Sequence, residues 1–433
     1  MIDVVAVIMA GGKGERLMPL TKNRAKPAIP FGGIYILLDL TLSNCINSGI
    51  YKIVVLPQYK SQSLMEHLEA GWNIFSLDLG HYLRVVPPQM MVGEEWYQGT
   101  ADSIRQNVYF LEKNRSELTI ILSGDHVYKM NYAGFRKYHD EKEADMTISV
   151  IEVDRETASG FGVIGVDDDY RVKEFVEKPT DPPSIPGDEK HALASMGIYI
   201  FKTDILLDIL KHTDHVDFGK EIIPEMIHNH RIYAYPYRKM NAIDDLIYVT
   251  RHDGRRETRR EKRVRDSGYW RDVGTLDSYW NSNMDLTGVD PYFNLYGRKW
   301  PIRTYQRQYP PVKTVFENEH SDQPRVGKAV DSIIAHGCIV SGATVRHCVV
   351  SYNVIFESYS LVEESVIMEN VRIGRNCKIR KAIIDEGCYI PDGTVIGYDP
   401  FQDRKHYTQT NRGIVVVNQD NFPGYLYGTI NQK

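Results

Sequence analysis

The fold of the first half of the chain is decided by residues 4–17, VVAVIMAGGKGERL. Its apolar start, residues 4–10, predicts a buried strand, and the glycines at Gly11, Gly12 and Gly14 predict a tight turn directly after it. Glycines in such a turn let backbone N–H groups approach phosphate oxygens, beside a helix N-terminus that favours anions. Arg16 adds a forked, cationic donor. No Gly-Lys-Ser/Thr follows and the glycine spacing is not the dinucleotide fingerprint, so the turn is neither of those phosphate loops.

Further along, apolar strands alternate with amphipathic segments as far as about residue 240. Residues 53–56, 119–122 and 146–150 are short buried-strand candidates, whereas 101–113 and 132–143 show helical spacing. This alternation predicts a Rossmann-like α/β domain with a mainly parallel sheet covered on both faces. In such sheets the ligand lies at the carboxyl ends of the strands.

The last third of the chain carries a six-residue period. Eight of the eleven gaps between its aliphatic positions are six residues long and three are five. These positions are Ile333, Ile339, Val345, Val350, Ile355, Leu361, Ile367, Ile373, Ile379, Ile384, Ile390 and Ile396. A β-sandwich would not sustain this period, which is the hexapeptide signature of a left-handed parallel β-helix with each aliphatic side chain inside. We expect domains at 1–290 and 326–433, joined by a linker at 291–325, and we expect the β-helix to be covered by the first domain or by a partner.

Composition restricts the function classes. The net charge is −5, with 42% hydrophobic and 25% charged residues, which predicts a globular protein without a general affinity for nucleic acid or for an anionic membrane. The five cysteines lack C-x-x-C spacing, and the first strand does not resemble a signal peptide, so we expect a cytoplasmic protein with reduced thiols. The basic segment 251–265 could hold phosphates or nucleic acid, but a solvated excursion is favoured because no aromatic residues are interleaved to stack bases.

Several motifs then follow in a fixed order. Arg24-Ala25-Lys26-Pro27 lies ten residues beyond the glycine turn, and Asp125 follows a buried strand, at its carboxyl end. The remaining segments are WYQGTAD at 96–102, FGV at 161–163, FVEKP at 175–179, SMGIY at 195–199 and WRDVGT at 270–275. Together they resemble the sugar-phosphate nucleotidyltransferases and, among these, the ADP-glucose pyrophosphorylases, over nearly the whole chain.

The resemblance implies a reaction of ATP with glucose 1-phosphate that gives ADP-glucose and diphosphate for glycogen or another α-glucan. It implies that Arg16, Lys26 and Asp125 are catalytic and that Asp125 and Asp272 bind Mg²⁺. It assigns the nucleotide to Gly11, Gly12, Gly14, Gln89, Gly99 and Thr100. It assigns glucose 1-phosphate to Tyr97, Gly162, Glu177, Lys178 and Ser195. Read without the family, Glu177 and Lys178 could be a surface ion pair and Tyr97 a core aromatic.

The resemblance also implies a homotetramer with sugar-phosphate or nucleotide effectors bound between the domains. Such sites need cations, yet Asn23, Ile34 and Ile36 stand where many members of the family carry Lys or Arg. Isoleucine cannot bind phosphate, so we predict weak, altered or absent activation by sugar phosphates. Gln58 and Trp96, which resemble positions linked to effector response, are present.

Three other functions compete with this interpretation. A related enzyme could use another base or sugar. A regulatory subunit should have lost charged site residues, but Arg16, Lys26, Asp125, Lys178 and Asp272 all remain. An acyltransferase is a further alternative because hexapeptide helices often carry that activity, although His336 and His347 are the only histidines within the six-residue period at 333–396.

Overall fold

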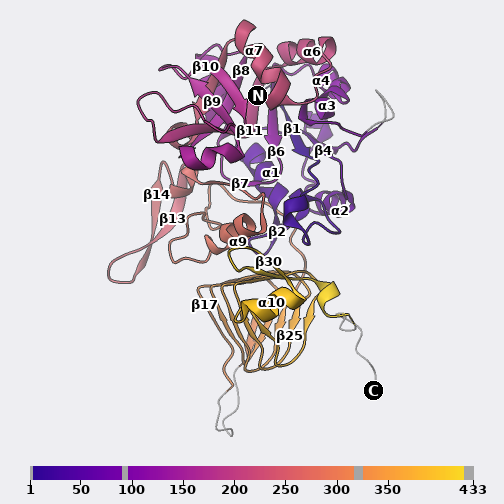
Figure 1. Ribbon diagram of the computed structural model, residues 1–433, viewed down its shortest axis with the longest axis vertical. Coiled ribbons are helices and arrows are strands. Elements are labelled where there is room, and N and C mark those ends of the chain that lie inside the picture. Colours follow the sequence, from indigo (N-terminus) through magenta and orange to yellow (C-terminus); the bar gives the residue numbers. More distant parts are fainter. Residues whose placement is uncertain (1–2, 90–95, 316–324, 424–433) are drawn as a thin grey trace.

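The computed structural model describes residues 3–89, 96–315 and 325–423. In Figure 1 the N-terminal α/β domain lies above the β-helix, and the polypeptide passes from one to the other once. Among the described residues, no helix combines the length and the apolar composition needed to cross a membrane.

A nine-stranded sheet forms the centre of the first domain, in the order β10-β9-β11-β6-β1-β4-β5, with β8 beside β11 and β12 beside β8. Its strands are β1 (Val4–Ala10), β4 (Lys52–Pro57), β5 (Tyr82–Val85), β6 (Leu118–Ser123), β8 (Met146–Asp154), β9 (Gly162–Val166), β10 (Val172–Glu177), β11 (His191–Lys202) and β12 (Ile232–Pro236). Only β10 and β11 run against the others, so the prediction of a mainly parallel sheet is confirmed.

Both faces of this sheet are covered. Along β1, Val5 and Val7 belong to one buried cluster, while Ala6 and Ile8 belong to another, because successive strand residues point to opposite faces. The covering helices are α1 (Leu37–Asn47), α2 (Gln62–Gly71), α3 (Thr100–Arg105), α4 (Val108–Asn114), α5 (Tyr132–Glu141), α6 (Thr203–His212), α7 (Ile223–Asn229) and α8 (Tyr237–Met240). The predicted helix at 101–113 is therefore two helices, α3 and α4. Helix α9 (Leu276–Met284) packs in the cluster between the two domains instead.

Three parallel sheets form the second domain, as the hexapeptide period predicts. The first contains β16 (Lys313–Val315), β19 (Ile339–Ser341), β22 (Ile355–Phe356), β25 (Arg372–Ile373) and β28 (Tyr389–Ile390). The second contains β17 (Lys328–Val330), β20 (Thr344–Arg346), β23 (Leu361–Glu363), β26 (Lys378–Arg380) and β29 (Val395–Ile396). The third contains β18 (Ile333–Ile334), β21 (Val349–Val350), β24 (Val366–Ile367), β27 (Ala382–Ile384), β31 (Val415–Val417) and the antiparallel β30 (Thr408–Gln409); α10 (Pro400–His406) follows the last coil. Because β16 already belongs to this β-helix, the β-helix begins within the segment predicted as a linker.

Four of the twelve positions predicted inside the β-helix do not lie in its interior cluster: Ile333, Ile339, Ile355 and Leu361. Each of the four is followed directly by a second apolar residue. That second residue lies in the interior cluster at Val340, Phe356 and Val362 and packs against the cluster at Ile334. The strand register explains the choice, because Ile339 and Ile355 align with Arg372, a side chain that cannot be buried without a partner.

The β-helix packs on the first domain through one of its side faces. The outward residues of its third sheet, including Val349, Val366 and Ile383, form one buried cluster with Leu17, Phe31 and Tyr279 of the α/β domain. We expected the end of the β-helix to contact the first domain. In the structure an apolar side face of the β-helix makes this contact instead.

Candidate active site

The glycine turn after β1 leads into a short 3-10 helix, Glu15–Leu17. Gly14 has φ +66°, and a Cβ built on it would lie 2.8 Å from Thr21 Cγ2, so this position requires glycine. No described atom lies within 4 Å of a Cβ built on Gly12, which leaves the turn open on that side. The helix is too short for a substantial dipole. We therefore correct the expectation that a helix N-terminus supports the turn; the candidate phosphate cradle consists of backbone N–H groups and Arg16.

Two carboxylates converge on one lysine at the carboxyl ends of the strands. Lys26 Nζ lies 2.7 Å from Asp125 Oδ2 and 3.5 Å from Asp272 Oδ1. Asp125 follows β6, and the antiparallel pairing of β7 (His126–Tyr128) with β15 (Trp270–Asp272) brings Asp272 opposite His126. Residues that are far apart in sequence, Asp125 and Asp272, therefore share a single site.

The electrostatics of this group keep its charges in place. Burial opposes ionisation of Asp125, but Lys26, His126 and a hydrogen bond from Ser123 outweigh it and hold the pKa of Asp125 well below its ordinary value. Burial likewise opposes the charge on Lys26, yet the two carboxylates raise the pKa of Lys26 overall. Both groups thus remain charged at neutral pH, and an incoming phosphate has to compete with carboxylates for the lysine.

Arg16 reaches the same group from the glycine turn. A Cβ built on Gly274 would lie 3.0 Å from Arg16 Nη2 and 2.9 Å from Asp272 Oδ2, so both side chains pack against that glycine. The three catalytic residues predicted from sequence, Arg16, Lys26 and Asp125, are therefore gathered with Asp272 in one place.

The two carboxylates beside Lys26 could hold a magnesium ion. Among the described residues, no group of three or more His, Cys, Asp or Glu side chains is arranged to hold a metal ion. Magnesium commonly takes one or two carboxylates and completes its shell with water and substrate phosphates. Asp125 and Asp272 meet that requirement, because both already approach a single cation, Lys26 Nζ.

A cavity of about 300 Å³ opens beside the carboxylates. Five of the predicted residues line it: Thr100, Gly162, Glu177, Ser195 and Asp272. Ser195 reaches the cavity because the pairing of β11 with β8 is interrupted between Ser195 and Tyr199, and Gly197 adopts φ +65° in that interruption. Gly162 pairs with Glu177 across β9 and β10, and any Cβ there would lie 2.9 Å from Glu177 Oε2.

Other cavity residues were not singled out from the sequence. Asp217 lines the cavity and also caps the following helical turn, since its side chain accepts hydrogen bonds from Gly219 and Lys220 N–H at 2.9 and 3.0 Å. An aspartate before Phe-Gly-Lys is a capping pattern that could have drawn attention to it. His126 and Trp270 line the cavity too, and their rings meet edge to face at 5.2 Å.

Ten predicted residues do not line this cavity: the three glycines of the turn, Arg16, Lys26 and Asp125, described above, and Gln89, Tyr97, Gly99 and Lys178. Tyr97 is buried, and its hydroxyl accepts a hydrogen bond from Asn107 at 2.9 Å. Gln89 lines another cavity and donates to the Pro87 carbonyl, whereas Gly99 allows a close backbone approach to Val216. Lys178 is exposed at 64% and lies 3.5 Å from Glu177.

Tyr97 and Trp96 nevertheless connect to the glycine turn. Gln58 packs against Gly11 and donates to the Tyr97 carbonyl at 2.9 Å. Trp96 stacks on Tyr59 with ring centroids 5.7 Å apart. Lys13 of the glycine turn lies 5.4 Å from the centroid of the same Tyr59 ring, so the WYQGTAD segment is attached to the turn through the Tyr97 carbonyl and through Trp96.

Comparison with known proteins agrees with this geometry. Residues 5–288 match the family "Nucleotidyl transferase", and residues 310–417 match "GlmU-like, C-terminal hexapeptide". The glucose-1-phosphate adenylyltransferase of Koribacter versatilis is 46% identical over 97% of this chain and 96% of its own length. The chain belongs to the glucose-1-phosphate adenylyltransferase family. The family resemblance and the enzyme class predicted from sequence are thereby confirmed.

Two further relatives come from other organisms. The glucose-1-phosphate adenylyltransferase of Methylococcus capsulatus is 46% identical over 96% of this chain and 94% of its own length. Glucose-1-phosphate adenylyltransferase 2 of Vibrio cholerae is 44% identical over 96% of this chain and 98% of its own length. Both domains are therefore shared with the glucose-1-phosphate adenylyltransferases.

Proposed function

We propose that this chain transfers the adenylyl group of ATP to glucose 1-phosphate, releasing diphosphate and supplying ADP-glucose for α-glucan synthesis. The observation that carries the proposal is the convergence of Asp125 and Asp272 on Lys26 at the mouth of a sugar-sized cavity. The names of the relatives state the same substrate and the same transferred group.

The reaction needs no covalent intermediate with the protein. A phosphate oxygen of glucose 1-phosphate attacks the α-phosphorus of ATP, the bond to the β-phosphate breaks, and diphosphate leaves with its electron pair. The obstacle is repulsion between two anions, so positioning and electrostatic stabilisation supply the catalysis. Lys26 and Arg16 offset the charge on the departing diphosphate, while N–H groups of the glycine turn hold the triphosphate.

The sugar lies in the 300 Å³ cavity in this proposal. Glu177 and Asp217 accept hydrogen bonds from glucose hydroxyls, and Ser195 offers a hydroxyl that donates or accepts. Lys178, at the outer end of β10, attracts the phosphate from solvent. Asp125 and Asp272 would hold Mg²⁺, which when bound supplies positive charge to the reacting phosphates.

Product analysis tests the sugar. The purified chain with ATP and Mg²⁺ is offered glucose, galactose, mannose or N-acetylglucosamine 1-phosphate, and nucleotide sugars are identified by mass spectrometry. We expect ADP-glucose to dominate. Preferential use of another sugar 1-phosphate would contradict the assignment of the cavity to glucose.

Regulation is proposed to depart from the pattern implied by the resemblance. Asn23, Ile34 and Ile36 line a cavity of about 910 Å³ between the two domains. Its arginines are already paired: Arg24 contacts Asp385 and Glu386 at 2.9 and 2.8 Å, and Arg307 contacts Glu369 at 2.6 Å. A phosphorylated effector would find no unpaired guanidinium among these residues, so we propose weak, altered or absent activation by sugar phosphates.

A dose–response assay with fructose bisphosphate, fructose 6-phosphate, pyruvate and AMP tests this regulation. Strong activation by fructose bisphosphate would refute it. We further propose a homotetramer acting in the cytoplasm, which light scattering of the purified chain and fractionation of its source cells can check.

A further inference from the structure

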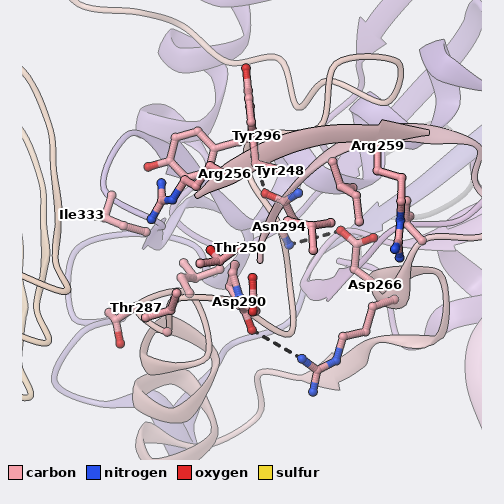
Figure 2. Close-up of a pocket in the computed structure, with 18 of the residues that line it drawn as sticks. Tyr248, Thr250, Arg256, Arg259, Asp266, Thr287, Asp290, Asn294, Tyr296 and Ile333 are labelled. Carbon is pink, nitrogen blue, oxygen red and sulfur yellow. Dashed lines mark hydrogen bonds between the residues drawn. The ribbon is translucent and has the colours of Figure 1, made fainter. Parts of the chain in front are cut away.

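A second large cavity lies under the hairpin formed by β13 (Asp245–Thr250) and β14 (Arg256–Glu261). Its volume is about 830 Å³, and its other walls are the loop at 286–291 and the start of the β-helix at 331–333 (Figure 2). We refer to it as the hairpin cavity. Among the described residues, none lines both the hairpin cavity and the glucose cavity.

The hairpin contains much of the basic segment 251–265, which the proposed reaction does not use. That segment was expected to be a solvated excursion, and its arginines are indeed exposed, but its residues Arg256–Glu261 form strand β14. The base of the hairpin is fixed by Asp245, whose carboxylate accepts N–H bonds from Arg298 and Lys299 at 2.8 and 2.7 Å. A wall fixed without a ligand lowers the entropy lost on binding.

Two tyrosines stand at the edge of the hairpin cavity. Tyr248 is 43% exposed and Tyr296 is 61% exposed. Figure 2 shows the two rings near each other, one from β13 and one from the segment after α9. Arg298 lies 5.5 Å from the centroid of the Tyr248 ring and restrains it. Exposed, restrained aromatic rings favour ligands with an apolar face and a polar rim, as sugar rings have.

The charges around the hairpin cavity cancel. Three arginines and four carboxylates line it: Arg256, Arg259, Arg265, Glu261, Asp266, Asp290 and Asp331. Lys129, behind the wall, pairs with Asp266 at 2.6 Å and neutralises the surplus carboxylate. Arg259 is bound to Glu261. The lining together with Lys129 therefore has no net charge, which suits a neutral ligand. Arg256 and Arg265 form no ion pair among the described residues, so an anion is the competing ligand that a binding experiment has to distinguish.

Hydroxyl groups complete the lining. Thr250, Thr258 and Thr287 line the hairpin cavity and can donate or accept hydrogen bonds. Aromatic rings, hydroxyls and balanced charges together suit a neutral, polyhydroxylated ligand.

We propose that the hairpin cavity binds a segment of neutral α-glucan. The choice of α-linked glucose rests on the proposed function, because the synthesis of α-glucan consumes ADP-glucose. Binding would hold the enzyme beside the polymer that uses its product.

Isothermal titration of the full chain with maltoheptaose tests the proposal. We expect saturable binding that Tyr248→Ala and Tyr296→Ala each weaken about tenfold through loss of ring stacking and burial. Tyr398→Ala, at a 41% exposed tyrosine of the β-helix, is the matched control and should bind normally. Thermal unfolding establishes that each variant is folded.

Three results would overturn the proposal: no binding of maltoheptaose, equal loss in Tyr398→Ala, or equally tight binding of cellohexaose. Binding of ADP or inorganic phosphate that disappears in Arg256→Ala would also overturn it, by showing an anion site. Diphosphate release is measured on the same samples. Turnover without glucan binding defeats only this inference, whereas glucan binding without turnover defeats the proposed reaction.

Discussion

Lys26 joins two carboxylates that come from distant parts of the chain, and this contact defines the candidate site at the level of single residues. Asp125 is the more buried carboxylate, with 21% of its side chain exposed against 29% for Asp272. Its depressed pKa means that it carries full charge at every pH at which the protein is expected to work.

Replacing Asp125 with Asn removes that charge while keeping the shape. We expect a folded protein with turnover reduced about a hundredfold or more, since a lost charge contact of this kind costs about 2–4 kcal/mol in the barrier. Steady-state kinetics and thermal unfolding are the measurements. Asp78→Asn, at an exposed carboxylate outside the site, is the control. Most of the turnover surviving in Asp125→Asn would show that the metal assignment is wrong.

The carboxylate of Glu177 lines the cavity proposed to hold the sugar, and its charge can be tested by substitution. Glu177→Gln exchanges a charged acceptor for a neutral one, so KM for glucose 1-phosphate should rise about tenfold or more. The KM for ATP should change little, because in the proposed reaction Glu177 contacts the sugar and not the nucleotide. A rise in KM for ATP alone would place Glu177 with the nucleotide instead.

Sequence reasoning found the charged residues of this site but not all of its walls. Arg16 follows a glycine turn and Asp125 a buried strand, where local pattern indicates function, whereas Lys26 and Asp272 were assigned through motifs that resemble those of the family. Tyr97 could not be placed in that way, because an aromatic beside a glycine suits a core as well as a pocket, and the structure buries it.

Among the structural elements, the β-helix was predictable from its six-residue period. Its register was not predictable at every coil, because in some coils either of two adjacent residues could point inward. Ile339-Val340 and Ile355-Phe356 each offer two apolar neighbours, and spacing alone cannot tell which of the two is inside. The alignment of Ile355 with Arg372 on the next coil decides it.

A matched pair of substitutions tests that register. Val340 is fully buried, so Val340→Thr places a hydroxyl in the interior and should lower the free energy of unfolding by about 1–3 kcal/mol. Ile339→Thr makes a similar change on the outer side and should stay within about 0.5–1 kcal/mol of the unsubstituted chain. Urea unfolding of both variants gives the comparison. A larger loss for Ile339→Thr would reverse the register.

The hairpin of β13 and β14 shows a different limit of sequence reasoning. The many arginines of this segment suggested that it is solvated. In the structure several of them form ion pairs with neighbouring carboxylates; Arg260, for example, pairs with Asp244. A short hairpin of alternating charges has the same composition as a disordered segment. Only the pairing of its two strands, which the sequence does not show, distinguishes a hairpin from a disordered segment.

For the whole molecule, the central feature is the flank on which the β-helix meets the α/β domain. Arg24 crosses this boundary and pairs with Asp385 and Glu386, with only 7% of its own side chain exposed. It lies two residues before Lys26, so the domain contact and the candidate site share one loop.

Loss of Arg24 should have a pH-dependent cost. Burial raises the pKa of Asp385, and Arg24 offsets only part of that effect. An ionised carboxylate with a raised pKa costs stability, and this cost grows as pH rises above the ordinary value of about 3.9. Arg24→Ala should therefore lower the free energy of unfolding by about 3 kcal/mol at pH 8. The loss should be smaller at pH 5, where Asp385 gains a proton more readily.

Unfolding by urea at the two pH values measures this difference. Lys22→Ala, which breaks the exposed pair with Asp420, should cost less than about 1 kcal/mol at both and serves as the control. An equal loss for Arg24→Ala at pH 5 and pH 8 would contradict the role given to Asp385.

The most direct test of the proposed reaction is the rate of diphosphate release with glucose 1-phosphate, compared across ATP, UTP, GTP and dTTP, each with and without Mg²⁺. We predict rapid release with ATP alone, and only when Mg²⁺ is present. Equal or faster release with another nucleotide would contradict the assignment of adenine, and no release from folded protein with any of them would contradict the proposed reaction itself.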